Sequence, residues 1–103
     1  IYNRLAQHVP LGIDATVYYA LDIPFTTPLT QSDLAFKSPY NTRVEAGLPP
    51  TPISSPDMDY INAALHPAQT NDLYYVLGPD CVHHKFFSSF AEFEQAAANQ
   101  PKC

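Results

Sequence analysis

Hydrophobic and polar positions along the first part of the chain predict short elements. Residues 1–6 (IYNRLA) place Ile1 and Leu5 one helical turn apart, which favours a helix that ends before Pro10. Residues 16–21 (TVYYAL) are β-branched and aromatic, so this segment could form a buried strand. A helical turn is the competing interpretation of the same six residues, because a short apolar run has no decisive period.

Two later segments carry patterns that start helices. Thr30, with Asp33 three residues later, predicts a short helix capped by the threonine. Ser55, followed directly by a proline, predicts another helix with the serine as its N-cap, and this helix is expected to end at Pro67. Three apolar side chains of that helix share one face. They are Met58, Ile61 and Leu65.

The last third of the chain predicts a hairpin followed by a helix. Residues 73–77 (LYYVL) have the composition of a strand, and residues 82–87 could return as its antiparallel partner after a Gly-Pro-Asp turn. Residues 89–92 (SFAE) have the capping-box pattern that starts a final helix. The predicted apolar stripe of that helix consists of Phe90, Phe93 and Ala97.

Residues 37–56 follow no regular period, because five prolines and Gly47 exclude a central strand or a long helix. Apolar side chains are nevertheless spread along this segment, which favours an ordered loop. They are Tyr40, Val44, Leu48 and Ile53. Taken together, the elements predict an α+β fold, in which a small antiparallel sheet is packed with two to three short helices and a long proline-rich ordered loop.

Composition limits the function more than it defines it. The chain has 103 residues, of which 46% are hydrophobic and 15% charged, and this balance suits one small globular domain. Ten acidic residues against five lysines and arginines give a net charge of −5. Because no basic cluster is present, a nucleic-acid partner is not expected. An uncharged or mildly charged ligand fits the chain better.

The two cysteines leave two interpretations open. Cys81 and Cys103 lie 22 positions apart, and a disulfide between them in an oxidising compartment would contribute roughly 3 kcal/mol by loop entropy. Cys103 is also the last residue, however, and chain ends usually fray. The sequence contains no apolar run of transmembrane length and no lipidation signal.

Metal and cofactor chemistry find no support in the motifs. His83 and His84 are adjacent, so as strand residues they would point to opposite faces and could not bind one metal together. No zinc-binding spacing, nucleophile elbow or glycine-rich phosphate loop is present, and none of the lysines has the context of a pyridoxal-phosphate site. We therefore expect neither a metal nor a cofactor.

Polar groups beside aromatic rings are the remaining candidates. Asp14 precedes the segment 16–21, where a carboxylate could either cap the next element or face a ligand. Residues 38–42 (SPYNT) place hydroxyls and an amide beside a tyrosine ring. Such residues are ordinary turn formers, but sugar sites are furnished in the same way, since apolar sugar faces stack on rings and hydroxyls need directed partners.

Several segments, in order along nearly the whole chain, resemble the YceG/MltG-type endolytic murein transglycosylase family. Residues 3–5 (NRL) and 14–17 (DATV) are similar to its N-R-L helix and its D-x-T-V stretch. Residues 38–42 (SPYNT) and 47–53 (GLPPTPI) resemble its S-P-Y-N-T and G-L-P-P-x-P-I signature, which is the specific part of the likeness. Weaker likenesses follow at residues 63–67, 73–76 and 84–86.

The resemblance implies a bacterial, membrane-anchored enzyme at the extracytoplasmic face of the inner (cytoplasmic) membrane. Such an enzyme cuts peptidoglycan glycan strands internally and leaves 1,6-anhydro-muramic acid ends. One glutamate would act as acid and then as base, and the resemblance places it upstream of Ile1. Residues 1–103 would then be the C-terminal portion of a single catalytic domain, a fragment without the upstream segment. The implied partners are glycan strands and cell-wall synthases, with membrane contact only through a segment outside this chain.

The resemblance also suggests which residues bind the substrate. Asp14, Thr16 and Tyr19 would line the floor of a cleft. The muramic acid and acetamide groups would be held by Tyr40, Asn41 and Thr42, and the prolines after Gly47 would fix the loop wall. The predicted substrate-binding residues are Asp14, Thr16, Tyr19, Ser38, Tyr40, Asn41, Thr42, Pro49 and Pro50. The family often has glutamine at Gly12, and its arginine-rich stretch is reduced to Arg43. A non-catalytic glycan- or partner-binding module is the alternative function.

Overall fold

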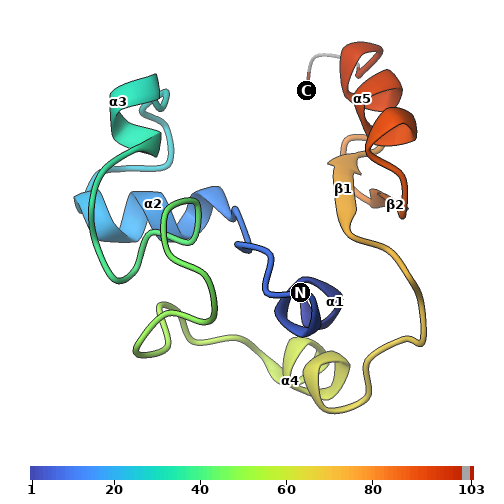
Figure 1. Cartoon of the computed structure of the whole chain (residues 1–103), viewed down its shortest axis with the longest axis horizontal. Coiled ribbons are helices and arrows are strands. Elements are labelled where there is room, and N and C mark those ends of the chain that lie inside the picture. The colour runs from blue at the N-terminus through green and yellow to red at the C-terminus, as the bar shows by residue number, and fades with distance from the viewer. Residues whose placement is uncertain (101–102) are drawn as a thin grey trace. The chain divides into compact units, whose positions relative to one another are not determined.

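The computed structural model describes residues 1–100 and 103, and the chain divides into two compact units, Ile1–Pro67 and Ala68–Cys103. Over these residues it contains five helices and a two-stranded antiparallel sheet (Figure 1). The predicted α+β class is therefore confirmed. None of the helices in the described residues has the length and apolar character needed to cross a bilayer.

The first unit begins with α1 (Tyr2–Ala6) and α2 (Asp14–Leu21). Of the two interpretations that the sequence left open for residues 16–21, the helical one is correct and the strand is wrong. Thr16 and Val17 are both buried although they are adjacent, and adjacent strand residues would point to opposite faces. Burying both in a strand would need a layer on each side, whereas a helix can turn both toward one loop.

The other helices of this unit are α3 (Gln31–Leu34) and α4 (Met58–Leu65). α3 has the predicted capping box, since Thr30 Oγ1 accepts from the Asp33 N–H at 3.1 Å and the Asp33 carboxylate accepts from the Thr30 N–H at 2.9 Å. α4 ends before Pro67 as expected, but its N-cap is Asp57 and not Ser55. The Ile61 N–H donates to the Asp57 carbonyl at 3.2 Å, so the helical bonding starts two residues later than predicted.

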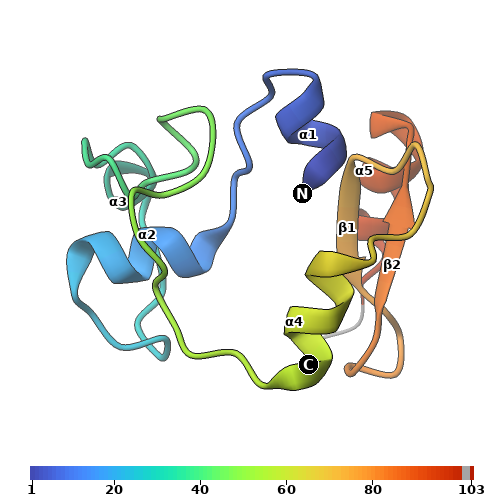
Figure 2. The ribbon, with the colours of Figure 1, turned by 90° about the horizontal axis from the view of Figure 1, so that it is seen from below.

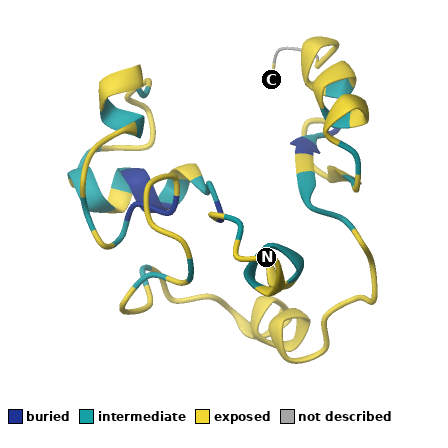
Figure 3. Ribbon diagram, in the orientation of Figure 1, coloured by how far each residue is buried: buried dark blue, intermediate teal, exposed yellow. Residues whose placement is uncertain are grey.

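Residues 35–56 contain neither helix nor strand and form the predicted ordered proline-rich loop. Asn41 and Thr42, near its start, are buried against the rest of the unit. The core is small, and its fully or nearly fully buried apolar members are Leu11 and Val17 (Figure 3). The polar side chains of Thr16, Asn41 and Thr42 share this core. Hydrogen bonds therefore contribute to holding the unit together, in addition to apolar packing.

The second unit contains β1 (Tyr74–Leu77), β2 (His84–Phe87) and α5 (Phe90–Ala98), and both predicted strands are confirmed. The strands pair with Tyr74 opposite Phe87 and Leu77 opposite His84. α5 lies against one face of the hairpin, where the Tyr74 ring contacts Phe90 and Phe93 at centroid distances of 5.6 and 5.4 Å (Figures 1 and 2).

The ends of the predicted apolar stripe on α5 differ from the expectation. Ser89 caps the helix as expected, with its hydroxyl accepting from the Glu92 N–H at 3.4 Å. Ala97 is exposed, and its neighbour Ala96 is the half-buried residue in the later turns of the helix. On the opposite face of the hairpin, Tyr75 and Phe86 are also exposed.

Cys81 and Cys103 form a disulfide, with their Cα atoms 5.7 Å apart. Of the two interpretations that the sequence left open, the bonded one is correct. The bond joins the turn after β1 to the last residue of the chain, so β2 and α5 lie inside the loop that it closes.

Replacing Cys103 by serine should destabilise the second unit by roughly 3 kcal/mol, because the open chain regains the entropy of a 22-residue loop. Urea unfolding of the 103-residue chain, followed by tyrosine fluorescence, measures this change. A reducing agent should destabilise the wild type equally and leave the Cys103→Ser chain unaffected. Equal midpoints for the reduced and oxidised wild type would contradict the prediction.

The hairpin turn is closed by Asp80, whose carboxylate accepts from the His83 ring at 2.7 Å and from the backbone N–H groups of His83 and Val82 at 3.0 and 3.1 Å. The sequence predicts His83 as a strand residue, but in the structure it lies just before β2. The bond from the His83 ring, followed by the backbone bonds, holds the pKa of Asp80 well below its ordinary value.

Because folding lowers this pKa, Asp80 stabilises the turn fully above the ordinary aspartate pKa of about 3.9, and the contribution is lost as the pH falls further. In an NMR titration between about pH 5 and pH 2, the Asp80 carboxyl should therefore remain ionised when exposed aspartates are protonated. The Asp80→Asn chain should lose less stability than the wild type over that range. A carboxyl that titrates at the ordinary value would exclude this role.

Candidate functional site

Residues predicted to bind substrate come together where α2 meets the start of the proline-rich loop (Figure 1). The hydroxyl oxygens of Thr16 and Thr42 lie 2.8 Å apart, and both residues are almost fully buried. The Ile13 N–H donates to Thr42 Oγ1 at 2.9 Å, and the Thr42 N–H donates to Thr16 Oγ1 at 3.2 Å. The Gly12 N–H also donates to the Thr42 carbonyl at 3.0 Å.

The distances assign the two hydroxyl hydrogens. Thr16 Oγ1 lies 2.6 Å from the Ile13 carbonyl oxygen, whereas Thr42 Oγ1 lies 3.4 Å from it, so Thr16 is the better donor to that carbonyl. The hydroxyl of Thr42 then donates to Thr16 Oγ1. With this assignment each hydroxyl both donates and accepts, so neither of the two buried side-chain oxygens is left without a partner.

Asn41 is completely buried and uses both ends of its amide. Its Nδ2 donates to the carbonyls of Leu34 and Phe36 at 3.1 and 2.7 Å, and these carbonyls lie at the C-terminal end of α3. Its Oδ1 accepts from the Arg43 N–H at 2.9 Å. Asn41 thus satisfies carbonyls that a helix end cannot satisfy itself, and it fixes the loop to α3.

The side chains of Thr16, Asn41 and Thr42 are therefore turned into the chain. Their polar atoms are occupied by internal hydrogen bonds, and their exposed fractions are 3%, 0% and 2%. Being buried, these three residues do not form the surface that a ligand would meet. They hold in place the neighbouring residues that do form it.

Asp14 is the first residue of α2, and it does not cap the helix, since the N-cap is Ile13. Its Oδ1 instead accepts from Nε and Nη2 of Arg43 at 2.8 and 2.5 Å. The side chains of Asp14 and Arg43 remain 55% and 39% exposed. This exposure keeps the ion pair within reach of a ligand and limits its contribution to stability to about 1 kcal/mol or less.

Tyr19 and Tyr40 supply the aromatic surface. Their ring centroids lie 4.9 Å apart at an interplanar angle of 49°, and Tyr19 is 46% exposed. The Tyr40 hydroxyl is 2.8 Å from Thr51 Oγ1, which joins the two ends of the loop segment 40–51. Ser38 accepts from the Tyr40 N–H through its hydroxyl at 3.2 Å, so it shapes the turn beside this ring. Of the predicted prolines, Pro49 is half-buried and Pro50 is exposed.

A hollow of about 410 Å³ lies beside α2 and is lined mainly by residues that sequence reasoning missed. Tyr19 is the one predicted site residue among them. On α2, the lining side chains follow helical spacing, which the strand interpretation of this segment concealed. The lining residues are Ala15, Tyr18, Tyr19, Asp22, Ile23, Phe25, Ile53 and Ser54.

Tyr18 and Phe25 form the apolar side of this hollow. Their rings pack edge to face at 5.1 Å, and the Tyr18 hydroxyl donates to the Thr27 carbonyl at 2.6 Å. Phe25 is nevertheless 74% exposed. An exposed ring beside a carboxylate (Asp22) and a hydroxyl (Ser54) can accept an apolar face and orient hydroxyl groups, as a sugar requires.

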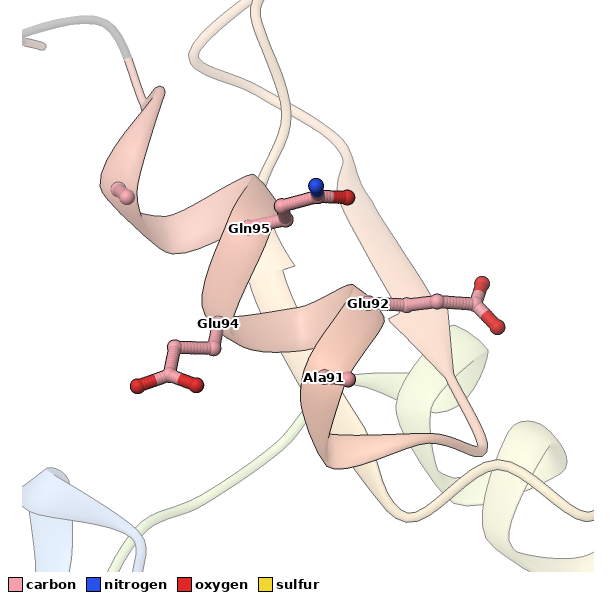
Figure 4. A pocket seen from close by; sticks show the side chains of 5 residues that line it. Ala91, Glu92, Glu94 and Gln95 are labelled. Atoms are coloured by element: carbon pink, nitrogen blue, oxygen red, sulfur yellow. The ribbon is translucent and has the colours of Figure 1, made fainter.

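A second hollow, of about 430 Å³, lies along α5 and contains none of the predicted site residues. Its lining consists of exposed residues of this one helix, and Glu92 and Glu94 point away from each other (Figure 4). Glu45 is exposed as well. A general acid at neutral pH needs partial burial, which none of these three glutamates has.

Metal or cofactor chemistry gains no support from the geometry. Within residues 1–100 and 103, no three histidine, cysteine, aspartate or glutamate side chains are grouped as a metal site would require. The Asp80–His83 pair stands at a surface turn, with the histidine side chain 84% exposed.

Comparison with known proteins gives consistent matches. The profile of the YceG-like family matches residues 1–99. A Bacillus subtilis protein named endolytic murein transglycosylase is 43% identical over 75 residues, and a Streptococcus pneumoniae protein of the same name is 32% identical over 79. Each match covers 73% of this chain, which spans 21% of the Bacillus protein and 14% of the Streptococcus protein.

A solved structure agrees with these matches. The crystal structure of a YceG-like protein from Listeria monocytogenes is similar with a TM-score of 0.84 and 37% identity. The similarity covers 91% of this chain and 30% of the Listeria chain.

The threonine pair makes a sharp prediction. Thr42→Val keeps the shape of the side chain but leaves the partly buried Ile13 N–H without its acceptor, which should destabilise the chain by about 1–3 kcal/mol. Thr42→Ser keeps the hydroxyl and should cost only about 1 kcal/mol or less for the lost methyl group. Urea unfolding of the two variants beside the wild type measures the difference. A valine variant as stable as the serine variant would refute the assigned bonds.

Proposed function

Because this chain belongs to the YceG-like family, we propose that it is one part of an endolytic murein transglycosylase that cuts peptidoglycan glycan strands internally. The products would carry 1,6-anhydro-muramic acid ends. The observation that carries the proposal is the family match over residues 1–99, together with relatives named for this activity at 43% and 32% identity. The chain is proposed to be the C-terminal portion of the catalytic domain.

In this proposal the chain contributes a glycan-binding surface beside α2. The rings of Tyr19 and Phe25 would stack on apolar sugar faces, and Asp22 would accept from sugar hydroxyls. Asp14, with its partner Arg43, would bind polar groups next to this surface. Tyr40, Pro49 and Pro50 would form the loop wall, with Ser38 shaping its turn. Thr16, Asn41 and Thr42 would act as positioning residues that hold the loop against α2.

The acid/base glutamate is proposed to come from a segment outside these 103 residues. The exposure of Glu45, Glu92 and Glu94 supports this, because each lacks the surroundings that a general acid needs. The glutamic acid would protonate the glycosidic oxygen as its bond to C1 breaks. The resulting carboxylate would accept the proton of the C6 hydroxyl while that oxygen bonds to C1, so no water is consumed and one carboxyl group suffices.

The disulfide supports an extracytoplasmic location for the protein. Structural disulfides persist in oxidising compartments and are rare in the cytosol of ordinary bacteria. Peptidoglycan lies on the same side of the cytoplasmic membrane. Any membrane anchor is proposed to lie outside this chain.

A non-catalytic glycan-binding module is the second candidate, and the exposed glutamates favour it for the isolated chain. Digestion of purified glycan strands followed by mass spectrometry distinguishes the two. The complete protein that carries this chain should release anhydro-ended fragments, whereas the 103-residue chain alone should bind sedimented peptidoglycan without cleaving it. Anhydro ends made by the isolated chain would overturn the assignment of the acid, and none from the complete protein would overturn the enzyme.

Substitution of Tyr19 tests the binding surface within the same assay. Tyr19→Ala in the complete protein should lower kcat/KM for glycan cleavage about tenfold, since stacking contributes about 1 kcal/mol beyond the loss of buried area. Tyr75→Ala is the matched control, because Tyr75 is also 46% exposed and lies in the other unit. An equal kcat/KM for the two variants would show that Tyr19 does not contribute to glycan binding.

A further inference from the structure

Within the unit Ile1–Pro67, α4 is an apolar helix that no other element covers. Met58, Ile61 and Leu65 lie on one face of it, here called the α4 stripe, and they are 64%, 39% and 68% exposed. No residue of α4 is buried. Figure 3 shows the whole helix as exposed. A helix on the surface of a folded protein normally turns such a stripe to the core.

Local contacts do not explain why this helix is stable. An isolated helix of eight residues is marginal in water, and its stability in a protein comes from packing of its apolar face. The bond from the Tyr2 hydroxyl to the Ala64 carbonyl, at 2.7 Å, ties α4 to α1. In the described part of this unit, close backbone packing between helices is limited to α2 and α3. The unit Ile1–Pro67 thus leaves the α4 stripe open to a partner from outside this unit.

We propose that the α4 stripe docks on the portion of the YceG-like domain that lies outside these 103 residues, in the same polypeptide. The partner surface would be apolar and would bury Met58, Ile61 and Leu65. The length of the relatives supports this occupant. The Listeria structure reproduces 91% of this chain with only 30% of its own residues, so most of that protein is available to cover surfaces that are open here.

A second copy of the chain fits the stripe less well. One face of an eight-residue helix is about 12 Å long and 10 Å wide, far below the roughly 800 Å² that each partner of a stable dimer buries.

A photo-crosslinking experiment in the complete protein tests the docking surface. Benzoyl-phenylalanine placed at Leu65 should give a cross-link within one polypeptide, to residues outside this 103-residue sequence, as mapped by mass spectrometry. The same probe at Ala63, which is exposed on the opposite face of α4, is the control and should give no such product. A cross-link to a second copy, a cross-link to residues 1–103, or no more product than at Ala63 would overturn the proposal.

The melting temperature of two variants tests the docking surface independently. Leu65→Asp should lower the Tm of the complete protein by about 5 °C or more relative to Ala63→Asp, which adds the same charge to the other face. In the 103-residue chain alone the two variants should differ little, since the stripe is already open there. An equal Tm in the complete protein would contradict the docking surface.

The inference rests on the part of the proposed function that makes this chain one section of a longer polypeptide. Its failure can be distinguished from failure of that function. A complete protein that gives the expected cross-link but no anhydro-ended glycans would refute the enzyme and retain the docking surface. Glycan cleavage without the cross-link would do the reverse.

Discussion

The unit Ile1–Pro67 depends on the hydrogen bond between the hydroxyls of Thr16 and Thr42. Its buried apolar side chains are few, and Leu11 and Val17 alone could not hold a long loop against a two-turn helix. The threonine pair does so by linking the backbone of Ile13 with the backbone of the loop. A buried polar network of this kind specifies one arrangement, because any other arrangement leaves desolvated groups without partners.

Asn41 extends the same constraint to α3. A four-residue helix has little stability of its own, and the amide of Asn41 satisfies two carbonyls near its end. The loop is thus fixed to α2 and α3 by consecutive residues, Asn41 and Thr42. The half-buried Tyr40 and the exposed Arg43, on either side, take their positions from these buried neighbours and are the ones that a ligand could contact.

Sequence reasoning predicted the fold class, the hairpin, the ordered loop and the family, because these depend on turn residues, strand composition and motifs. It left a strand and a helical turn open at residues 16–21, since so short a run of mainly β-branched and aromatic residues has no decisive period. Only the packing of Thr16 and Val17 settles the choice. The lining residues Tyr18 and Asp22 were missed for the same reason. Nor could the sequence show that Asn41 points inward, because an amide beside a ring suits a turn and a sugar equally well.

The bond between Tyr40 and Thr51 has a consequence for how the loop can respond to a ligand. Pro49 and Pro50, within this closed segment, have fixed φ angles, which limits how far this part of the loop can adapt. Gly47, with a φ of 92° and open space around it, is a position where the backbone can pivot. The closure by Tyr40 and Thr51 and the two prolines thus favour a narrow range of ligand shapes over a tolerant surface.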